Sequence, residues 1–406
     1  MHDFHRLPFY RGHQLTLSGR YSILRLALAF LIATAVSIAV DSGAQAQIFR
    51  TKAKQGFLYD FDTGSVLFEK KSDELIGPAS MAKVMTMAVV FEALTEKRLS
   101  LEDEFAVTEN AWRKGGAPSG TSTMFAKLNS SIRLEDLIQG AIVQSGNDAC
   151  IIIAEGMAGS EEAFARMMNE YARKLGHKKS YYTNATGLPD PSMRVTPREL
   201  AMLGDHVIRS YPDLYAFYKQ KEFTWNKIRQ YNRNPLLDKG LGVDGLKTGY
   251  TDESGYGIIV SAVRDRQRLI MVLSGMKSKK ERATEARKLL DWGFRSFEQI
   301  RLFDKGVTVG EARVHGGEIG HVPLIGRGPL TLLVPRGSRD RIKARIVYTG
   351  PVEAPIEAGQ PIGHLKVWRG EQLTQETPLY AAQSVATGTV YGRALDGLTE
   401  LLTSWW

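Results

Sequence analysis

The sequence has a single cysteine among its 406 residues. Cys150 has no partner within the chain, which excludes a fold held together by disulfide bonds. Histidine is also scarce, with eight residues, and the sequence contains no His-Glu-x-x-His or Gly-x-Ser-x-Gly motif. These absences argue against a zinc peptidase and against a hydrolase built on a Ser-His-Asp triad. We therefore expect chemistry that uses neither a metal nor a cofactor.

Acidic residues are outnumbered, because 53 Lys and Arg against 44 Asp and Glu give a formal net charge of +9. No Walker loop, zinc-finger spacing or RNA-binding aromatic motif accompanies this charge, so we expect no nucleic-acid partner. The basic residues between Lys277 and Lys288 alternate with Glu281 and Glu285, which is typical of a solvated helix face. An anionic membrane surface or wall polymer is the expected target of the positive charge.

An apolar run long enough for a membrane-spanning helix is missing as well. The shorter run from Leu26 to Val40 follows four arginines and precedes the small-residue site Ala44-Gln45-Ala46. This pattern predicts a secretory signal peptide over residues 1–46, cleaved before Gln47, and hence an exported protein. An uncleaved anchor is the alternative.

Ser80 stands at the start of an apolar run from Met81 to Leu94, just after Pro78. The run is apolar almost all round, which is typical of a buried helix. Lys83 follows Ser80 by three residues, so the two side chains share one helix face. A serine needs a base, and a lysine is one only when burial or nearby positive charge lowers its pKa. The pattern predicts Ser80 as nucleophile and Lys83 as general base, although alone it also fits a helix cap and a solvated lysine.

A second polar motif, Ser145-Gly146-Asn147, interrupts two helical patterns over Leu134–Val143 and Ala149–Met157. A glycine-containing turn between buried helices can direct a hydroxyl and an amide into a cleft. There Ser145 would transfer a proton and Asn147 would bind a substrate amide. The alternative is a connecting turn in which Asn147 or Asp148 caps a helix.

A third motif, Lys247-Thr248-Gly249, lies in an extended segment that two further strand patterns follow, over residues 256–263 and 268–274. On an edge strand facing a cleft, Lys247 and Thr248 would bind a substrate carboxylate, and Gly249 would permit close approach. The charge of Lys247 would also lower the pKa of Lys83. An exposed strand end is the alternative.

The order Ser-x-x-Lys, Ser-x-Asn, Lys-Thr-Gly marks penicillin-binding proteins and class A β-lactamases. Gly146, with Asp148-Ala149-Cys150 after it, is similar to the form in low-molecular-mass penicillin-binding proteins that are serine-type D-alanyl-D-alanine carboxypeptidases. Residues 77–81, 144–150, 229–234 and 291–295 resemble that family too. Tyr250 is a departure, because some relatives have histidine after Lys-Thr-Gly.

The resemblance implies removal of the terminal D-alanine from peptidoglycan stem pentapeptides, and acylation by β-lactam antibiotics, which mimic that dipeptide. It also implies an oxyanion hole made by the backbone N–H of the nucleophile and one from the strand after the third motif. The implied roles are nucleophile for Ser80, base for Lys83, proton transfer and peptide binding for Ser145 and Asn147, and substrate binding for Lys247, Thr248, Gly249, Arg233 and Arg282.

Strand patterns at both ends of residues 49–297, with helices between, predict an α+β catalytic domain with an antiparallel sheet covered by helices, as in the penicillin-binding and β-lactamase fold. A hairpin over residues 56–70 begins it and a helix over 280–297 closes it. Residues 298–384 show short strand patterns punctuated by glycine and proline, which predicts a small all-β domain. These patterns cover residues 331–334, 342–348, 362–368 and 379–382.

Residues 392–406 place Leu395, Leu398, Leu402 and Trp405 on one helical stripe. This predicts an amphipathic helix that anchors the protein in the plane of a membrane. Together with the signal peptide, it places the protein on the periplasmic face of the bacterial inner membrane. A helix docked on the all-β domain is the alternative.

Three other functions use the same motifs. A DD-endopeptidase would have the same residues. A β-lactamase fits less well, since no segment resembles the class A deacylation loop and the additional domain and tail are unexplained. A non-catalytic wall-binding scaffold would have no need of Lys83.

Overall fold

The structure is a computed structural model that describes residues 49–389, apart from residues 238, 337–341 and 370–371. The predicted signal peptide (1–46) and the predicted amphipathic helix (392–406) lie outside the described residues. Within the described part of the chain, no helix combines the length and the apolar character that a membrane crossing requires.

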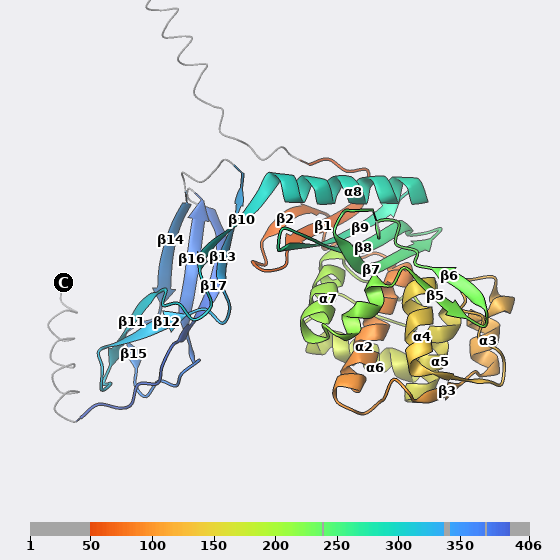
Figure 1. Ribbon diagram of the computed structural model, residues 1–406, viewed down its shortest axis with the longest axis horizontal. Helices are drawn as coiled ribbons and strands as arrows, with labels where there is room; N and C mark the ends of the chain where they lie inside the picture. Colours follow the sequence, from red (N-terminus) through yellow and green to blue (C-terminus); the bar gives the residue numbers. More distant parts are fainter. Residues whose placement is uncertain (1–48, 238, 337–341, 370–371, 390–406) are drawn as a thin grey trace, which may run out of the picture. The chain divides into compact units, whose positions relative to one another are not determined.

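A five-stranded antiparallel sheet forms the centre of the first part of the molecule, in the order β2-β1-β9-β8-β7 (Figure 1). The predicted N-terminal hairpin is confirmed, and β1 pairs with β9 in the middle of the sheet. The strand that carries the third motif, β7, is an edge strand, as predicted, and β2 is the other edge. The strands are β1 (Gln55–Asp60), β2 (Val66–Lys70), β7 (Val243–Thr251), β8 (Gly255–Arg264) and β9 (Gln267–Met276).

Helices cover both faces of this sheet (Figure 1). Successive strand residues point to opposite faces, so Leu269 and Met271 of β9 pack with one cluster and Ile270 and Val272 with the other. The first cluster includes α8 (Lys279–Ser296), the helix predicted to close the domain. The predicted α+β fold, with an antiparallel sheet covered by helices, is confirmed.

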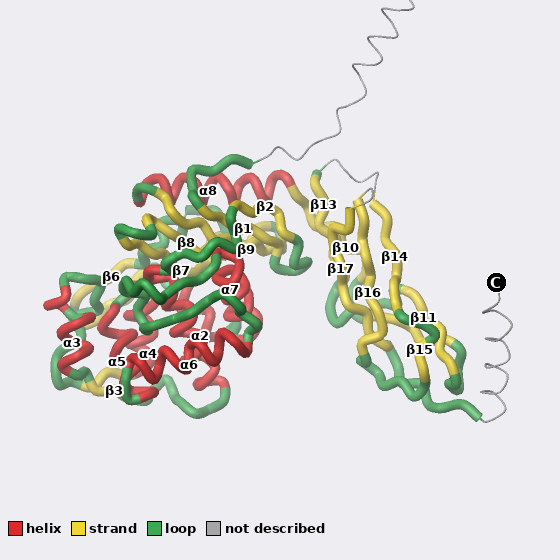
Figure 2. The backbone as a smooth tube through the Cα atoms, turned by 180° about the vertical axis from the view of Figure 1, so that it is seen from behind, coloured by secondary structure: helices red, strands yellow, loops and turns green. Residues whose placement is uncertain are grey.

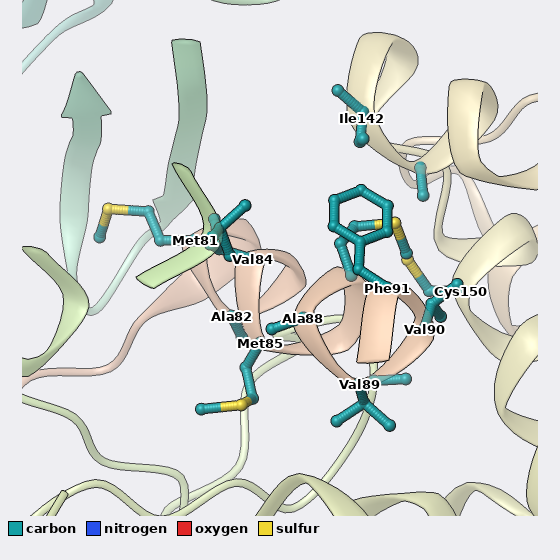
Figure 3. Close-up of a cluster of buried hydrophobic side chains, with 14 of the residues drawn as sticks. Met81, Ala82, Val84, Met85, Ala88, Val89, Val90, Phe91, Ile142 and Cys150 are labelled. Carbon is teal, nitrogen blue, oxygen red and sulfur yellow. The ribbon is translucent and has the colours of Figure 1, made fainter. Parts of the chain in front are cut away.

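The helices on the second face lie between β2 and β7 in the sequence. Among them α2 is buried on nearly all sides, as its apolar run predicts. Figure 3 shows the core around it, where Cys150 packs among apolar side chains, as expected for a structural cysteine. The helices are η1 (Ala79–Ala82), α2 (Lys83–Thr95), α3 (Glu109–Gly115), η2 (Ala117–Ser119), α4 (Leu134–Gln139), η3 (Gly140–Gln144), α5 (Asn147–Ala158), α6 (Glu161–Lys174), α7 (Pro197–Ser210) and η4 (Leu214–Lys219).

Two small two-stranded sheets complete this part: β3 (Glu104–Ala106) pairs with β4 (Ser131–Arg133), and β5 (Glu222–Trp225) pairs with β6 (Ile228–Tyr231). One expectation is wrong in part. The face of α8 that the charge pattern describes as solvated includes Arg282 and Glu285, which are both buried. Glu285 accepts hydrogen bonds from the Thr51 hydroxyl and the Lys52 backbone, and these partners compensate for its burial.

The remaining described residues form an all-β part, as predicted, and Figure 2 shows it built from strands and loops. It has its own hydrophobic core, which includes Val322, Leu324 and Leu379. A two-stranded sheet contains β10 (Phe297–Phe303) and β13 (Leu330–Pro335). A six-stranded sheet contains, in order, β14 (Ile342–Tyr348), β16 (Pro361–Arg369), β17 (Gln372–Ala381), β12 (His321–Ile325), β11 (Gly310–His315) and β15 (Val352–Glu353).

Candidate active site

Ser80 lies in the 3₁₀ turn η1, and α2 itself begins only at Lys83. Ala79, just before Ser80, has a φ of 48°, a conformation that costs free energy in a residue with a side chain. The edge strand β7 packs directly against this turn. A Cβ atom added to Gly249 would lie 3.0 Å from the carbonyl oxygen of Pro78, so the close approach predicted for Gly249 is to the backbone that carries Ser80.

The ammonium nitrogen of Lys83 lies at the centre of a hydrogen-bond network. This side chain is 1 % exposed, and its Nζ lies 3.0 Å from Ser80 Oγ. The same nitrogen donates to Asn147 Oδ1 at 2.7 Å and to the backbone carbonyl of Thr186 at 2.6 Å. A neutral amine has two N–H donors and one lone pair. In the charged form Nζ donates to Ser80 Oγ as well; in the neutral form, with both donors taken by the other two oxygens, the lone pair would face the Ser80 hydroxyl.

The surroundings of Lys83 make its neutral form more accessible than that of a solvated lysine. The pKa of Lys83 is lowered from 10.5 to about 8, mainly by burial; the charge of Arg233 acts in the same direction, whereas Cys150 and Asp148 raise the pKa. The hydrogen-bond partners of Lys83 in the described chain are all uncharged. This lysine is therefore poised to accept a proton.

Lys247 is buried too, with 2 % of its surface exposed. Burial, followed by the charges of Lys83, Arg233 and Arg282, holds its pKa well below the ordinary lysine value. Its Nζ donates a long hydrogen bond, at 3.4 Å, to the backbone carbonyl of Thr248. Among the described residues no Asp or Glu forms an ion pair with Lys247, so this group of basic side chains favours the binding of an anion.

The second motif follows a π-helical turn, η3, which is the last part of the helix predicted over Leu134–Val143. Ser145 ends this turn with a φ of 64° and is buried. Gly146, not Asn147 or Asp148, occupies the cap position of α5. The Asn147 amide is thereby free of capping, and while its Oδ1 accepts from Lys83, its Nδ2 donates to Thr121 Oγ1 at 2.9 Å.

Asp148 was not among the predicted site residues, yet it holds one wall of the site. Its carboxylate is fully buried and accepts hydrogen bonds from the Thr123 hydroxyl and from the backbone N–H groups of Met124 and Ala126. The same contacts explain why position 146 is a glycine. A Cβ atom there would lie 2.8 Å from Asp148 Oδ1 and 3.1 Å from the Met124 nitrogen.

The predicted site residues also do not include the loop of residues 184–187, which contacts Lys83. Asn184 Oδ1 accepts from the N–H groups of Thr186 and Gly187, which directs the Thr186 carbonyl to Lys83. Gly187 has a φ of 78°, and a Cβ atom there would lie 1.9 Å from the Ala79 carbonyl oxygen, so only glycine fits. The Asn-x-Thr-Gly sequence is a signal for such an Asx turn, which is visible before the structure is known.

Ser80 opens into a cleft of about 470 Å³. One wall is the loop of residues 120–122 with Arg233, whose guanidinium donates to Ser122 Oγ at 2.8 Å. Residues 186–189 and 250–252 also line it. Arg282 is not among the lining residues: it lies over the ring of Tyr256, 7 % exposed, with its Nε lacking a partner in the described chain. Burial lowers the pKa of Arg282 to about 10.

A serine within hydrogen-bond distance of a buried lysine, next to an edge strand that carries a second buried lysine, is the arrangement expected of a serine acyl-transfer enzyme that does without histidine. Residues 41–278 match the family model of D-alanyl-D-alanine carboxypeptidase, and residues 297–387 match that of the penicillin-binding protein 5 C-terminal domain. The chain belongs to the D-alanyl-D-alanine carboxypeptidase family of serine peptidases.

Known proteins resemble the chain over most of its length. It is 39% identical over 356 residues to the D-alanyl-D-alanine carboxypeptidase DacC of Escherichia coli K12, covering 87% of this chain and 89% of DacC. Penicillin-binding protein 5 of Haemophilus influenzae matches with a TM-score of 0.77 and 35% identity, over 83% of this chain and 98% of that one. Penicillin-binding protein D2 of Listeria monocytogenes, solved in the ampicillin-bound form, matches with a TM-score of 0.54 and 26% identity, over 61% and 98%.

These matches confirm the predicted family, fold class and enzyme class, and they favour the carboxypeptidase over the alternative functions.

Proposed function

We propose that this protein removes the terminal D-alanine of peptidoglycan pentapeptides through an acyl-enzyme on Ser80. The observation that carries the proposal is the Lys83 amine, buried, 3.0 Å from the Ser80 hydroxyl and already donating to two other oxygens. Its lone pair is directed to the one proton that must leave for the serine to attack.

In the first step Ser80 Oγ attacks the carbonyl carbon of the D-Ala–D-Ala bond while Lys83 takes the hydroxyl proton. The oxyanion of the tetrahedral intermediate is held by the backbone N–H groups of Ser80 and Tyr250. Lys247 and Thr248 bind the terminal carboxylate, aided by the charges of Arg233 and Arg282.

In the second step the C–N bond breaks and D-alanine leaves as an amine, after a proton has passed to its nitrogen from Lys83 through Ser145. Asn147 holds the peptide and keeps Lys83 oriented. Water then attacks the ester, Lys83 takes its proton, and Ser80 is released as the hydroxyl.

β-Lactam antibiotics would enter the same cleft and acylate Ser80, since the ring amide stands in for the D-Ala–D-Ala bond. The L. monocytogenes relative with ampicillin bound supports this reading. We further propose export by residues 1–46 and peripheral attachment to the periplasmic face of the inner membrane by residues 392–406. Deleting residues 392–406 should then move the protein to the soluble fraction of lysed cells, and unchanged membrane association would refute the anchor.

The direct test is D-alanine release from a pentapeptide, measured for wild type and for Ser80→Ala. Wild type should release one D-alanine per peptide and the variant none. Mass spectrometry after penicillin treatment should locate the adduct on Ser80. Active protein with no adduct there, or a Ser80→Ala variant with wild-type release, would refute the mechanism. Cross-linked peptide dimers as substrate measure any endopeptidase activity.

A further inference from the structure

The end of β7 presents an aromatic ring and a carboxylate to the cleft, and the acylation chemistry uses neither side chain. Tyr250 and Asp252 both line the cleft, and Tyr250 is 49 % exposed. The Tyr250 ring stacks on Tyr256 of β8, with centroids 4.2 Å apart, and its hydroxyl donates to the Asp252 carboxylate. These two contacts fix the ring before any substrate binds, so the wall is preorganised.

The cleft has a positively charged part and a separate negatively charged part. Among its lining side chains in the described chain, Arg233 is the cation and Asp252 the anion. Arg233 belongs to the wall with Ser122, whereas Asp252 lies beyond the end of β7. No lysine, arginine or histidine of the described residues forms an ion pair with Asp252, although its neighbour Glu253 is paired with Arg194 at 3.1 Å. Asp252 therefore keeps its charge available for a ligand.

The direction of a bound peptide follows from the positions along β7. With its carboxylate at Lys247 and Thr248, the peptide places its scissile bond beside Ser80, whose turn packs on Gly249. The preceding residues then continue past Tyr250, antiparallel to the edge strand. Extended chains advance about 3.3 Å per residue, so the residue two positions before the terminal D-alanine lies beside Tyr250 and Asp252.

We infer that Tyr250 and Asp252 form a subsite for a cationic side chain on the residue two positions before the terminal D-alanine. An ammonium group there lies against the Tyr250 ring and pairs with the Asp252 carboxylate. The subsite rests on the proposed carboxypeptidase function and adds a preference among its substrates: stem peptides whose third-residue side-chain amine is free are favoured over those in which it is acylated. Elsewhere in the cleft this amine would approach Arg233, whose positive charge repels it.

The test compares two tripeptides, an Nα-acylated Lys-D-Ala-D-Ala with a free ε-amine and the same peptide with the ε-amine acetylated. Wild type should show a kcat/KM for the free amine about three- to ten-fold higher at low salt, as expected for one exposed ion pair and one cation–π contact. The preference should shrink in about 0.5 M salt, because an exposed pair is screened.

Three variants separate the subsite from general damage, since each ratio is measured within one enzyme preparation. Asp252→Asn should bring the ratio of the two peptides to about one. Asp252→Lys should reverse the preference toward a peptide whose ε-amine is succinylated and thus anionic. The matched control is Glu253→Gln, the next carboxylate along the chain, which should keep the wild-type rates and ratio.

A ratio that Asp252→Asn leaves unchanged, or a failure of Asp252→Lys to favour the anionic peptide, would overturn the subsite. Failure of the proposed function would give a different result from failure of the subsite alone. If wild type releases D-alanine from both peptides at equal rates and Ser80→Ala does not, the carboxypeptidase stands and only the subsite falls. If wild type releases D-alanine from neither, the function falls and the subsite with it.

Discussion

The side chain of Lys83 illustrates how one residue acquires a function that its type alone does not supply. A solvated lysine is charged near neutral pH and is no base. Here burial removes the water, while Asn147 and the Thr186 carbonyl take two N–H groups and leave the third position to Ser80. Neither contact is local in the sequence, since Thr186 lies 103 residues from Lys83.

The pH dependence of acylation tests this state of Lys83. Since the base must be unprotonated and its pKa is about 8, the rate of Ser80 acylation by a penicillin should rise about ten-fold per pH unit below that value and level off above it. Stopped-flow measurement of acylation in the free enzyme gives the profile. Lys83→Arg, which stays charged throughout, is the control and should show no such rise. A wild-type rate that is constant from about pH 6 to pH 8 would contradict the assignment.

At this scale the sequence predicted the groups to which we assign the chemistry, but not the groups that hold them in place. Ser80, Lys83 and Lys247 belong to short motifs with a readable spacing, and the structure brings the first two within hydrogen-bond distance. Asp148 and Asn184 act through backbone groups of distant loops, and no periodic pattern reports such contacts. Arg282 matched a family position, yet its guanidinium lies over Tyr256 and outside the cleft lining.

Among the elements, the junction of η3 and α5 determines the shape of the cleft. The start of α5 supplies Asn147 to Lys83 and Asp148 to the loop of residues 123–126, so one helical turn connects the base to the opposite wall. The same loop is preceded by Thr121 and Ser122, which hold Asn147 and Arg233. A shift of this turn therefore moves several site residues at once.

Asp148→Asn tests that connection. An amide in place of the carboxylate keeps one acceptor oxygen and puts an NH2 group at the position of the other, so in either orientation at least one buried backbone N–H group, that of Ala149 or that of Ala126, faces a donor. We expect a loss of about 2–4 kcal/mol in the free energy of unfolding and slower acylation of Ser80. Urea denaturation and penicillin acylation measure the two effects. The exposed Asp213→Asn is the control and should change stability by less than about 0.5 kcal/mol. Equal stability and equal acylation rates for both variants would show that the contacts of the Asp148 carboxylate contribute neither to stability nor to the geometry of the site.

The elements that the sequence predicted are those with strong apolar patterns. The buried helix α2, the hairpin β1–β2 and the strands β7 to β9 bury continuous or alternating apolar runs. In the all-β part, β10, β11, β12 and β15 were not predicted. These strands are short or half-exposed, and β15 joins β11 through two residue pairs only, so pairing between distant segments defines them rather than local sequence.

For the whole molecule, the hydrophobic clusters divide by position in the chain. The two clusters around the five-stranded sheet draw on residues before 297, and the third draws on residues after it. We expect calorimetry to show two unfolding transitions. Acylation by penicillin should raise the midpoint of one transition only, because a ligand stabilises the unit that binds it. Ser80→Ala treated with penicillin is the control and should show no shift. A single transition that moves as a whole would instead indicate one cooperative unit.

The burial of Lys83 and Lys247 also affects the stability of the folded chain. Below about pH 8 both the folded and the unfolded chain carry the Lys83 proton, so the penalty of the buried charge is constant there. Between about pH 8 and pH 10.5 only the unfolded chain binds it, so the free energy of unfolding rises with pH, by about 3 kcal/mol from this residue.

The substitution Lys83→Met removes both the free-energy cost of the buried charge and the proposed general base. We expect this variant to be more stable than wild type by about 1–3 kcal/mol at pH 7 and to lose that advantage as the pH approaches 10.5. Chemical denaturation of both proteins across this pH range provides the comparison. A variant that is less stable at every pH would show that packing around the amine outweighs its charge. If the variant is more stable, as we expect, selection for thermal stability alone would remove Lys83. Its presence in so apolar a helix would then reflect selection for turnover at the expense of stability.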